Sequence, residues 1–198
     1  MSETPNVSYQ SEIFSTVYWK LKVPSHDIIK QKYLGSFIDG YENDIYKIPD
    51  GWVTTNTHTS FVENKLEEKD IIDEYNAIFD TIFENEWRGN FECWYQVYKN
   101  GEYQEYHDHL PSALSAIHFL RFNEEHKVPI FEDPASGLKS ITYASTLNKK
   151  LSRPSLTFTP EVEEGDIIIF PSYLKHAVPG GIYDSHRVTI SINLFITQ

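Results

Sequence analysis

The chain has 198 residues, enough for one sizeable domain with its own core, and no Gly/Ser-rich or Pro-rich linker divides it. Its 17 Lys and Arg residues against 29 Asp and Glu residues give a formal charge of -12, which disfavours nucleic acid and anionic membranes as partners. No apolar run reaches the length of a membrane span, and the single cysteine, Cys93, fits a reducing compartment. We therefore expect a cytoplasmic protein without membrane segments.

The first part of the chain predicts one strand followed by two helices. Residues 16–23 alternate apolar and polar side chains, as half-buried strands do. Residues 26–38 have the pattern of a short amphipathic helix that turns Ile28 and Ile29 inward. The clearest helix covers residues 64–87, where apolar side chains recur at three- and four-residue spacing and acidic side chains occupy the opposite face.

From Gly89 onward the pattern changes to short strands separated by Gly, Pro, Asn or Asp. Helices followed by strands favour an α+β, mainly β, domain whose β part is a sandwich or barrel. We expect a single domain over residues 1–198, in which 1–90 supply a strand and helical support and 91–198 form the β core that carries the site. The expected strands lie within residues 91–99, 113–122, 139–144, 155–159, 166–170 and 187–196.

The last of these strands has one apolar face and one polar face. Its even-numbered residues are Val, Ile or Leu, and they alternate with Arg187, Thr189 and Ser191. A guanidinium on an interior face needs an anionic partner, because burying an unpaired charge is costly. Arg187 with the hydroxyl of Thr189 is suited to a carboxylate, so we expect the polar face to line a cavity.

Three histidines are the candidate metal ligands. In an extended segment His107 and His109 project to one face while Asp108 points to the other, so both imidazoles can reach one ion. His176 follows the strand-like run 166–170 and a Pro turn, and brings a third imidazole from a distant part of the chain. Three neutral imidazoles can bind zinc, copper or iron(II) and leave other coordination positions open. Asp108 competes with His109 only if a bulge or a strand end turns it round.

The remaining histidines are not expected to bind a metal. His118 lies in an apolar strand and is expected in the core or the pocket wall. His26, His58 and His126 lie in polar or charged surroundings, which favours the surface. His186 directly precedes Arg187 and therefore points to the opposite side of an extended chain.

The two clusters of motifs resemble those of the iron(II)- and 2-oxoglutarate-dependent oxygenases, specifically the prolyl-hydroxylase-like group and its relatives in bacteria and tailed phages. The resemblance covers roughly residues 91–196. In that family a Tyr, a Gly three residues on, and an H-x-D motif six residues after the Gly form the first cluster, which Tyr98, Gly101 and His107 match. His109 stands where the family usually has a carboxylate ligand, so metal affinity and redox tuning can differ here.

The second cluster matches the family more closely. The motif G-D-x-x-x-F-P before a metal-binding His is matched by residues 165–171 and His176. Arg187 matches the basic residue with which the family grips the far carboxylate of 2-oxoglutarate. Thr189 matches the hydroxyl two residues later, and Tyr98 matches the co-substrate Tyr.

The resemblance implies a double-stranded β-helix, the cupin-like jelly roll, flanked by the amino-terminal helices. It also implies an oxidoreductase, namely a dioxygenase or hydroxylase that uses Fe(II), 2-oxoglutarate and O2. In this assignment iron is held by the three histidines 107, 109 and 176, and 2-oxoglutarate by Arg187, Thr189 and Tyr98. The substrate, a small molecule or a peptide, is not identified by the sequence. A homodimer is left open, and a viral source would place the protein in the host cytoplasm.

Two other functions stay open at this point. One is a cupin-like dioxygenase with a three-His metal that does not use 2-oxoglutarate, since such sites resemble those of some thiol dioxygenases. The other is a non-enzymatic, metal-stabilised jelly-roll binding module. Arg187 distinguishes them, because only a 2-oxoglutarate enzyme needs this residue deep in the pocket beside the metal.

Overall fold

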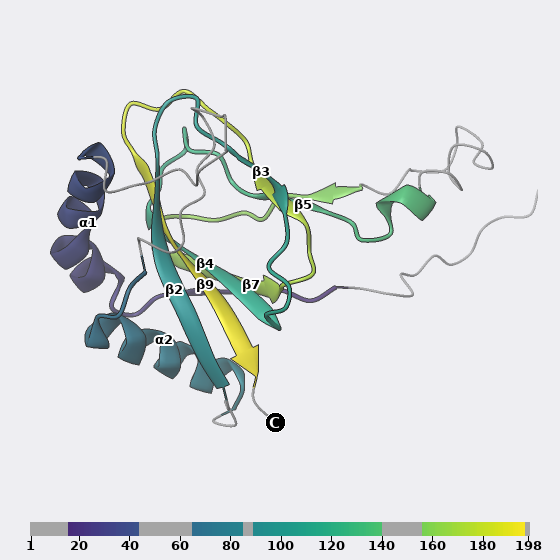
Figure 1. Ribbon diagram of the computed structural model, residues 1–198, viewed down its shortest axis with the longest axis horizontal. Helices are drawn as coiled ribbons and strands as arrows, with labels where there is room; N and C mark the ends of the chain where they lie inside the picture. The colour runs from purple at the N-terminus through teal and green to yellow at the C-terminus, as the bar shows by residue number, and fades with distance from the viewer. Residues whose placement is uncertain (1–15, 44–64, 85–88, 140–155, 197–198) are drawn as a thin grey trace, which may run out of the picture.

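Two antiparallel β-sheets form the centre of the computed structural model, which describes residues 16–43, 65–84, 89–139 and 156–196 (Figure 1). The five-stranded sheet has the order β1-β7-β4-β9-β2 and the four-stranded sheet the order β3-β8-β5-β6. This is the double-stranded β-helix that the motifs predict. The larger sheet consists of β1 (Trp19–Lys22), β2 (Gly89–Tyr98), β4 (Leu114–Arg121), β7 (Asp166–Pro171) and β9 (Arg187–Ile196), and the smaller of β3 (Gln104–His107), β5 (Ile130–Glu132), β6 (Thr157–Phe158) and β8 (His176–Val178).

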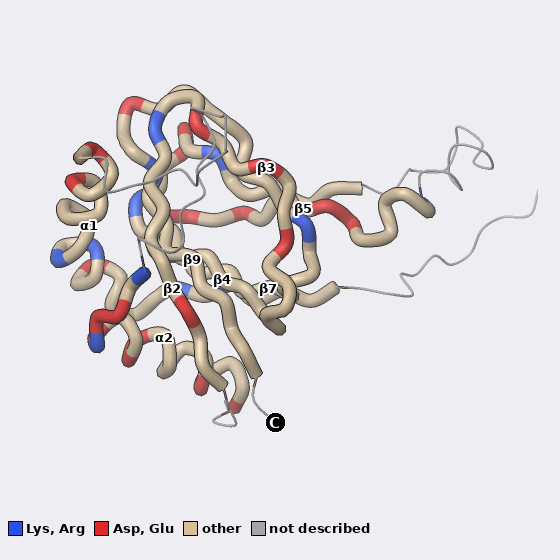
Figure 2. The backbone as a smooth tube through the Cα atoms, in the orientation of Figure 1, with Lys and Arg blue, Asp and Glu red and all other residues tan. Residues whose placement is uncertain are grey.

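Two helices, α1 (His26–Glu42) and α2 (Lys69–Ile82), cover one face of the larger sheet, while β3 and β5 lie on its other side (Figure 1). Acidic residues follow the exposed side of α2 and the segment before it, as the sequence predicts (Figure 2). No described helix is long and apolar enough to cross a membrane. The core between helices and sheet includes Ile29, Tyr33, Phe37, Ile71, Tyr75, Phe79, Val188, Ile190, Ile192 and Leu194.

Both helices differ from their predicted form. In α1 the buried side chains recur every four residues from Ile29, so Ile28 lies outside this stripe and is 65% exposed. The prediction that Ile28 turns inward is therefore wrong. The helix α2 begins five residues later than predicted because the amide of Leu66 donates to the carbonyl of Cys93 (2.8 Å), which keeps this segment extended beside β2. Residues 64 and 85–87 of the predicted helix lie outside the described residues.

The long strands match their predicted positions, whereas three short strands were not predicted. The patterns at residues 91–99, 113–122, 166–170 and 187–196 correspond to β2, β4, β7 and β9, and β6 falls within 155–159. Almost all of the strand expected at 139–144 lies outside the described residues. The strands β3, β5 and β8 have three or four residues each, too few for a two-residue alternation to stand out.

A buried chain of polar groups connects both helices to β4. The hydroxyl of Tyr75 bonds Nδ1 of His118 (2.8 Å), and Nε2 of His118 bonds Nδ1 of His26 (3.0 Å). In this chain each ring nitrogen of His118 has one partner, a phenol on one side and an imidazole on the other. Burial, with the nearby His26, lowers the pKa of His118 to about 3. The core prediction for His118 is confirmed.

Two histidines expected at the surface are largely buried. Only 12% of the His26 side chain is exposed, because it takes part in the chain just described. His126 is 4% exposed: its Nδ1 accepts from the amide of Asn123 (3.1 Å) and its Nε2 donates to the carbonyl of Ser185 (3.0 Å). His126 therefore fastens its own charged loop to the loop before β9. His58 lies outside the described residues.

The Tyr75–His118 hydrogen bond predicts a measurable effect on stability. We expect Tyr75→Phe to lower the free energy of unfolding in urea by about 1–3 kcal/mol, because it leaves a buried imidazole nitrogen without its hydrogen-bond partner. The control is Tyr106→Phe, since Tyr106 is 50% exposed and its hydroxyl can bond water in both states. Equal free energies of unfolding for the two variants would contradict this role of the buried hydroxyl.

Candidate active site

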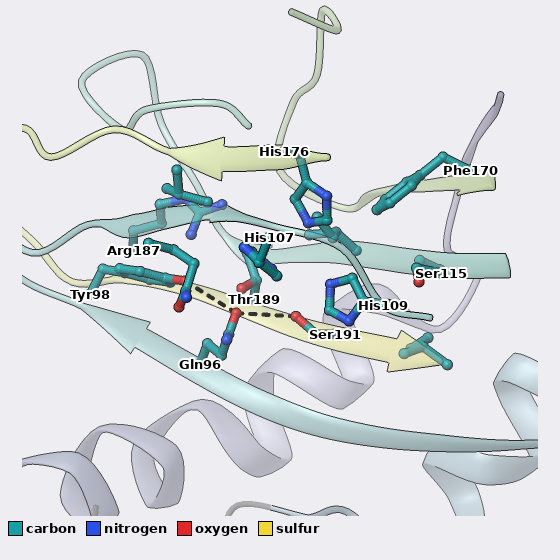
Figure 3. Close-up of a pocket in the computed structure, with 15 residues that line it drawn as sticks. Gln96, Tyr98, His107, His109, Ser115, Phe170, His176, Arg187, Thr189 and Ser191 are labelled. Atoms are coloured by element: carbon teal, nitrogen blue, oxygen red, sulfur yellow. Dashed lines mark hydrogen bonds between the residues drawn. The ribbon is translucent and has the colours of Figure 1, made fainter. Parts of the chain in front are cut away.

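The three predicted histidines lie together between the two sheets. His107 ends β3 and His176 begins β8, and the antiparallel register places them directly opposite each other. His109 follows two residues after β3, where its amide donates to the carbonyl of Ser172 (3.0 Å). One nitrogen from each ring lies within 4.8 Å of the other two, so small side-chain rotations bring all three onto one ion (Figure 3).

Backbone carbonyls orient two of the rings. Nδ1 of His107 donates to the carbonyl of Glu105 (2.7 Å), and Nδ1 of His176 donates to the carbonyl of Leu174 (3.0 Å). A proton on Nδ1 leaves the lone pair on Nε2, which is the usual arrangement of histidines that bind a metal. The donor set therefore fits a divalent metal.

The imidazoles of His109 and His176 are also held in the neutral form that a metal requires. Burial, followed by the nearby His107, lowers the pKa of His109 to about 4 and that of His176 to about 3. At neutral pH neither ring has to lose a proton before it binds an ion.

Asp108 lies outside this cluster. Its side chain is exposed, and Oδ1 accepts from the amide of Leu110 at 3.3 Å. The group of side chains that could hold a metal contains His107, His109 and His176 but not Asp108. The geometry therefore favours His109 over Asp108 as the third ligand.

The predicted carboxylate-binding residues lie in the same pocket as the histidines. Arg187 begins β9, is 1% exposed, and places its guanidinium carbon 4.8 Å from the centre of the Tyr98 ring. Its Nε and Nη1 have no hydrogen-bond partner among the described residues. Thr189 follows on the same face of β9 (Figure 3). A buried cation with two unused donors fits an anionic ligand.

The pocket holds about 360 Å3 of empty space, part of it open to solvent. The histidines, Arg187, Tyr98 and Thr189 all line it, and no Asp or Glu is among the described residues that do so. A bound divalent metal would therefore add to the positive charge of the guanidinium, and the pocket is suited to a small anion that reaches from one to the other.

Sequence reasoning missed Gln96, which also lines the pocket. Its Oε1 accepts from the hydroxyls of Tyr98 (3.2 Å) and Ser191 (3.1 Å) (Figure 3). The alternation in β2 could have located it, because Cys93, Tyr95 and Val97 pack in the helix-side core and leave the residues between them on the pocket side.

The neutral, buried histidines predict that the metal-free protein loses stability as the pH falls. Their folded-state pKa values, about 4 for His109 and about 3 for His176, lie below the ordinary value of 6.5. Below pH 6.5 the unfolded chain therefore takes up protons that the folded chain does not, until the folded pKa values are reached. We expect urea denaturation of the chelator-treated protein to give a falling free energy of unfolding from pH 6.5 to about 4, and a shallower fall for His176→Asn. Identical slopes for the variant and the unaltered protein would contradict this account.

The sequence and the fold both match known proteins. Residues 92–193 match a family described as "Putative 2OG-Fe(II) oxygenase". A prolyl-4-hydroxylase from Pseudomonas putida has 13% sequence identity and a TM-score of 0.59, over 92% of this chain and 94% of its own. A prolyl hydroxylase from Trichoplax adhaerens, in complex with a peptide fragment of hypoxia inducible factor, has 10% identity and a TM-score of 0.56, over 90% of this chain and 83% of its own.

AviO1 from Streptomyces viridochromogenes has 12% identity and a TM-score of 0.57, over 91% of this chain and 90% of its own. No curated protein matches the sequence. At these identities the solved structures establish the fold, and the family match, which covers both halves of the histidine cluster, establishes the chemistry. The chain thus belongs to the 2OG-Fe(II) oxygenase family and is an iron(II)- and 2-oxoglutarate-dependent dioxygenase with the double-stranded β-helix of the prolyl hydroxylases.

Proposed function

We propose that His107, His109 and His176 hold the iron(II) of this dioxygenase and that Arg187, with Thr189 and Tyr98, receives the far carboxylate of 2-oxoglutarate. The observation that carries this assignment is the buried guanidinium, which lies in the same pocket as the three imidazoles and keeps Nε and Nη1 without partners in the described part of the chain.

The position of Arg187 also favours this function over the two alternatives. A three-His dioxygenase without 2-oxoglutarate, or a metal-stabilised binding module, has no use for a buried cation beside the metal. Desolvating a guanidinium is costly, and the stacking against Tyr98 offsets only a part of that cost. A carboxylate that accepts hydrogen bonds from this guanidinium completes the site.

Bound iron(II) supplies the oxidative chemistry that couples decarboxylation of 2-oxoglutarate to hydroxylation of the substrate. The chain's own residues bind and orient the reactants. The three imidazoles would hold the metal, Arg187 would hold the far end of the co-substrate, and the buried walls limit the access of water. Three protein ligands leave the other coordination positions to the reactants.

The substrate is proposed to be a small molecule or a peptide, processed in the cytoplasm. The formal charge of -12 supports this over a nucleic acid, since phosphate contacts require clustered cations. The Trichoplax adhaerens hydroxylase of the same fold is in complex with a peptide fragment. We also propose that residues 1–198 form one domain, which the pairing of β1 with β7 supports because it joins the amino-terminal part to the larger sheet.

The ligand assignment predicts the metal content of alanine variants. We expect His107→Ala, His109→Ala and His176→Ala each to abolish stoichiometric iron(II) after anaerobic loading and desalting, measured by elemental analysis, because two imidazoles hold the ion too weakly. The matched control is Asp108→Ala, which should keep its iron. Loss of iron from Asp108→Ala together with retention by His109→Ala would show that the third ligand is Asp108.

The carboxylate assignment predicts the affinity for 2-oxoglutarate. Without oxygen, 2-oxoglutarate added to the iron-loaded protein should produce the charge-transfer band of a chelated keto acid. Arg187→Ala should still bind iron but need roughly a hundredfold more 2-oxoglutarate, because it loses a desolvated charged pair. Arg121→Ala, which changes an arginine of β4 outside the pocket, should titrate as the unaltered protein does. Equal affinities for the two variants would refute the assignment.

A further inference from the structure

A short chain of hydrogen bonds lies behind the guanidinium of Arg187. Tyr98 and Arg187 are direct neighbours across β2 and β9, and Gln96 and Thr189 are the next pair on the same face. The Tyr98 hydroxyl donates to Oε1 of Gln96 at 3.2 Å, and the Ser191 hydroxyl donates to the same oxygen at 3.1 Å (Figure 3). One amide oxygen therefore fastens both strands at the end of the pocket where the cation lies.

The direction of these bonds follows from their donors. The phenol oxygen of Tyr98 carries a single proton. The phenol proton then requires an acceptor, and Oε1 of Gln96 supplies it. Tyr98 cannot offer that same proton to a ligand carboxylate. Its contribution to carboxylate binding is therefore to hold Arg187 through the ring face, whose centre lies 4.8 Å from the guanidinium carbon.

The acceptor at the end of this chain is neutral, and this matters for the cation. A carboxylate at position 96 would draw the charge of Arg187 toward itself and compete with the ligand. An amide oxygen fixes the phenol without adding negative charge. The guanidinium thus keeps its full charge, and Nε and Nη1 stay without protein partners among the residues that the structure describes.

We infer that Gln96 is a positioning residue for the co-substrate: it fixes Tyr98, and through Tyr98 it holds Arg187 with Nε and Nη1 available to the far carboxylate. This rests on the proposed function, because it takes Arg187 as the group that binds that carboxylate. Gln96 then acts on 2-oxoglutarate without touching it, and a ligand that lacks the far carboxylate gains nothing from it.

The test compares two keto acids on the anaerobic, iron-loaded protein, with binding followed by the charge-transfer band and by calorimetry. 2-Oxoglutarate carries the far carboxylate, whereas 2-oxobutyrate has the same keto-acid end and lacks it. We expect Gln96→Met to weaken binding of 2-oxoglutarate about threefold to tenfold, as the loss of one neutral hydrogen bond does, and to leave 2-oxobutyrate unchanged. The matched control is Gln31→Met on the exposed side of α1, with both affinities unchanged.

Tyr98→Phe removes the same Tyr98–Gln96 hydrogen bond by a smaller change, the loss of one hydroxyl. It therefore tests the inference even if Gln96→Met does not fold. It should weaken binding of 2-oxoglutarate to a similar degree. The variant that carries both Gln96→Met and Tyr98→Phe should lose no more affinity for 2-oxoglutarate than Tyr98→Phe alone, because Gln96 acts through the Tyr98 hydroxyl. Effects of the two changes that simply add would overturn the inference.

Other outcomes separate this inference from the function on which it rests. If Arg187→Ala weakens binding of 2-oxoglutarate while Gln96→Met and Tyr98→Phe do not, the positioning role is refuted and the co-substrate site stands. If Gln96→Met weakens both keto acids equally, Gln96 acts on the fold or the metal and the inference is again refuted. If Arg187→Ala binds 2-oxoglutarate as tightly as the unaltered protein, both the site and the inference fall.

Discussion

A buried guanidinium that has no counter-ion among the described residues is the constraint to which the rest of the pocket conforms. Arg187 is 1% exposed, and the rings of Tyr98 and Phe119 lie 4.8 Å and 5.9 Å from its guanidinium carbon. Aromatic faces stabilise a cation but do not neutralise it. The three imidazoles contribute no negative charge either. With a metal at the proposed histidine site, both ends of the pocket would be complementary to one dianion, and 2-oxoglutarate has that charge.

In the antiparallel pair of β2 and β9, successive side chains alternate between the helix-side core and the pocket. Ten consecutive residue pairs run from Gly89 opposite Ile196 to Tyr98 opposite Arg187. Val188, Ile190, Ile192 and Leu194 belong to the core beneath the helices, whereas Arg187 and Thr189 line the pocket. A slip of one residue would send the guanidinium into the apolar helix side. The hydrophobic packing under α1 and α2 therefore also fixes the register of the carboxylate site.

The part of the site that sequence predicts is the part carried by long, regular elements. The strict alternation after Arg187 and the two-residue spacing of His107 and His109 each determine a face, so the polar wall and the paired imidazoles could be predicted. The fold class followed from the order of helices and strands together with these motifs. What could not be predicted depends on tertiary pairing: the extended segment at Leu66 forms because it pairs with β2, and His126 is buried because two distant loops meet.

The short strands show most clearly that features which depend on tertiary pairing could not be predicted from the sequence. The strands β3 and β8 carry His107 and His176, yet neither is long enough to reveal itself by periodicity. Each is held by its neighbour in the smaller sheet, and the direct pairing of the two histidines comes from that register. The sequence therefore indicates which residues meet, whereas the pairing of strands determines how they approach one another.

The two ends of the pocket belong to different sheets, so their separation depends on the packing between sheets. The metal-side histidines come from β3, β8 and the segment after β3, whereas Arg187 comes from β9 of the larger sheet. The ring of His176 lies 5.3 Å from that of Phe131 and 5.0 Å from that of Phe170, one from each sheet. Rigid aromatic side chains between the sheets resist compression and shear. This aromatic contact thus helps to set the distance between the imidazoles and the guanidinium, which the proposed co-substrate would have to span.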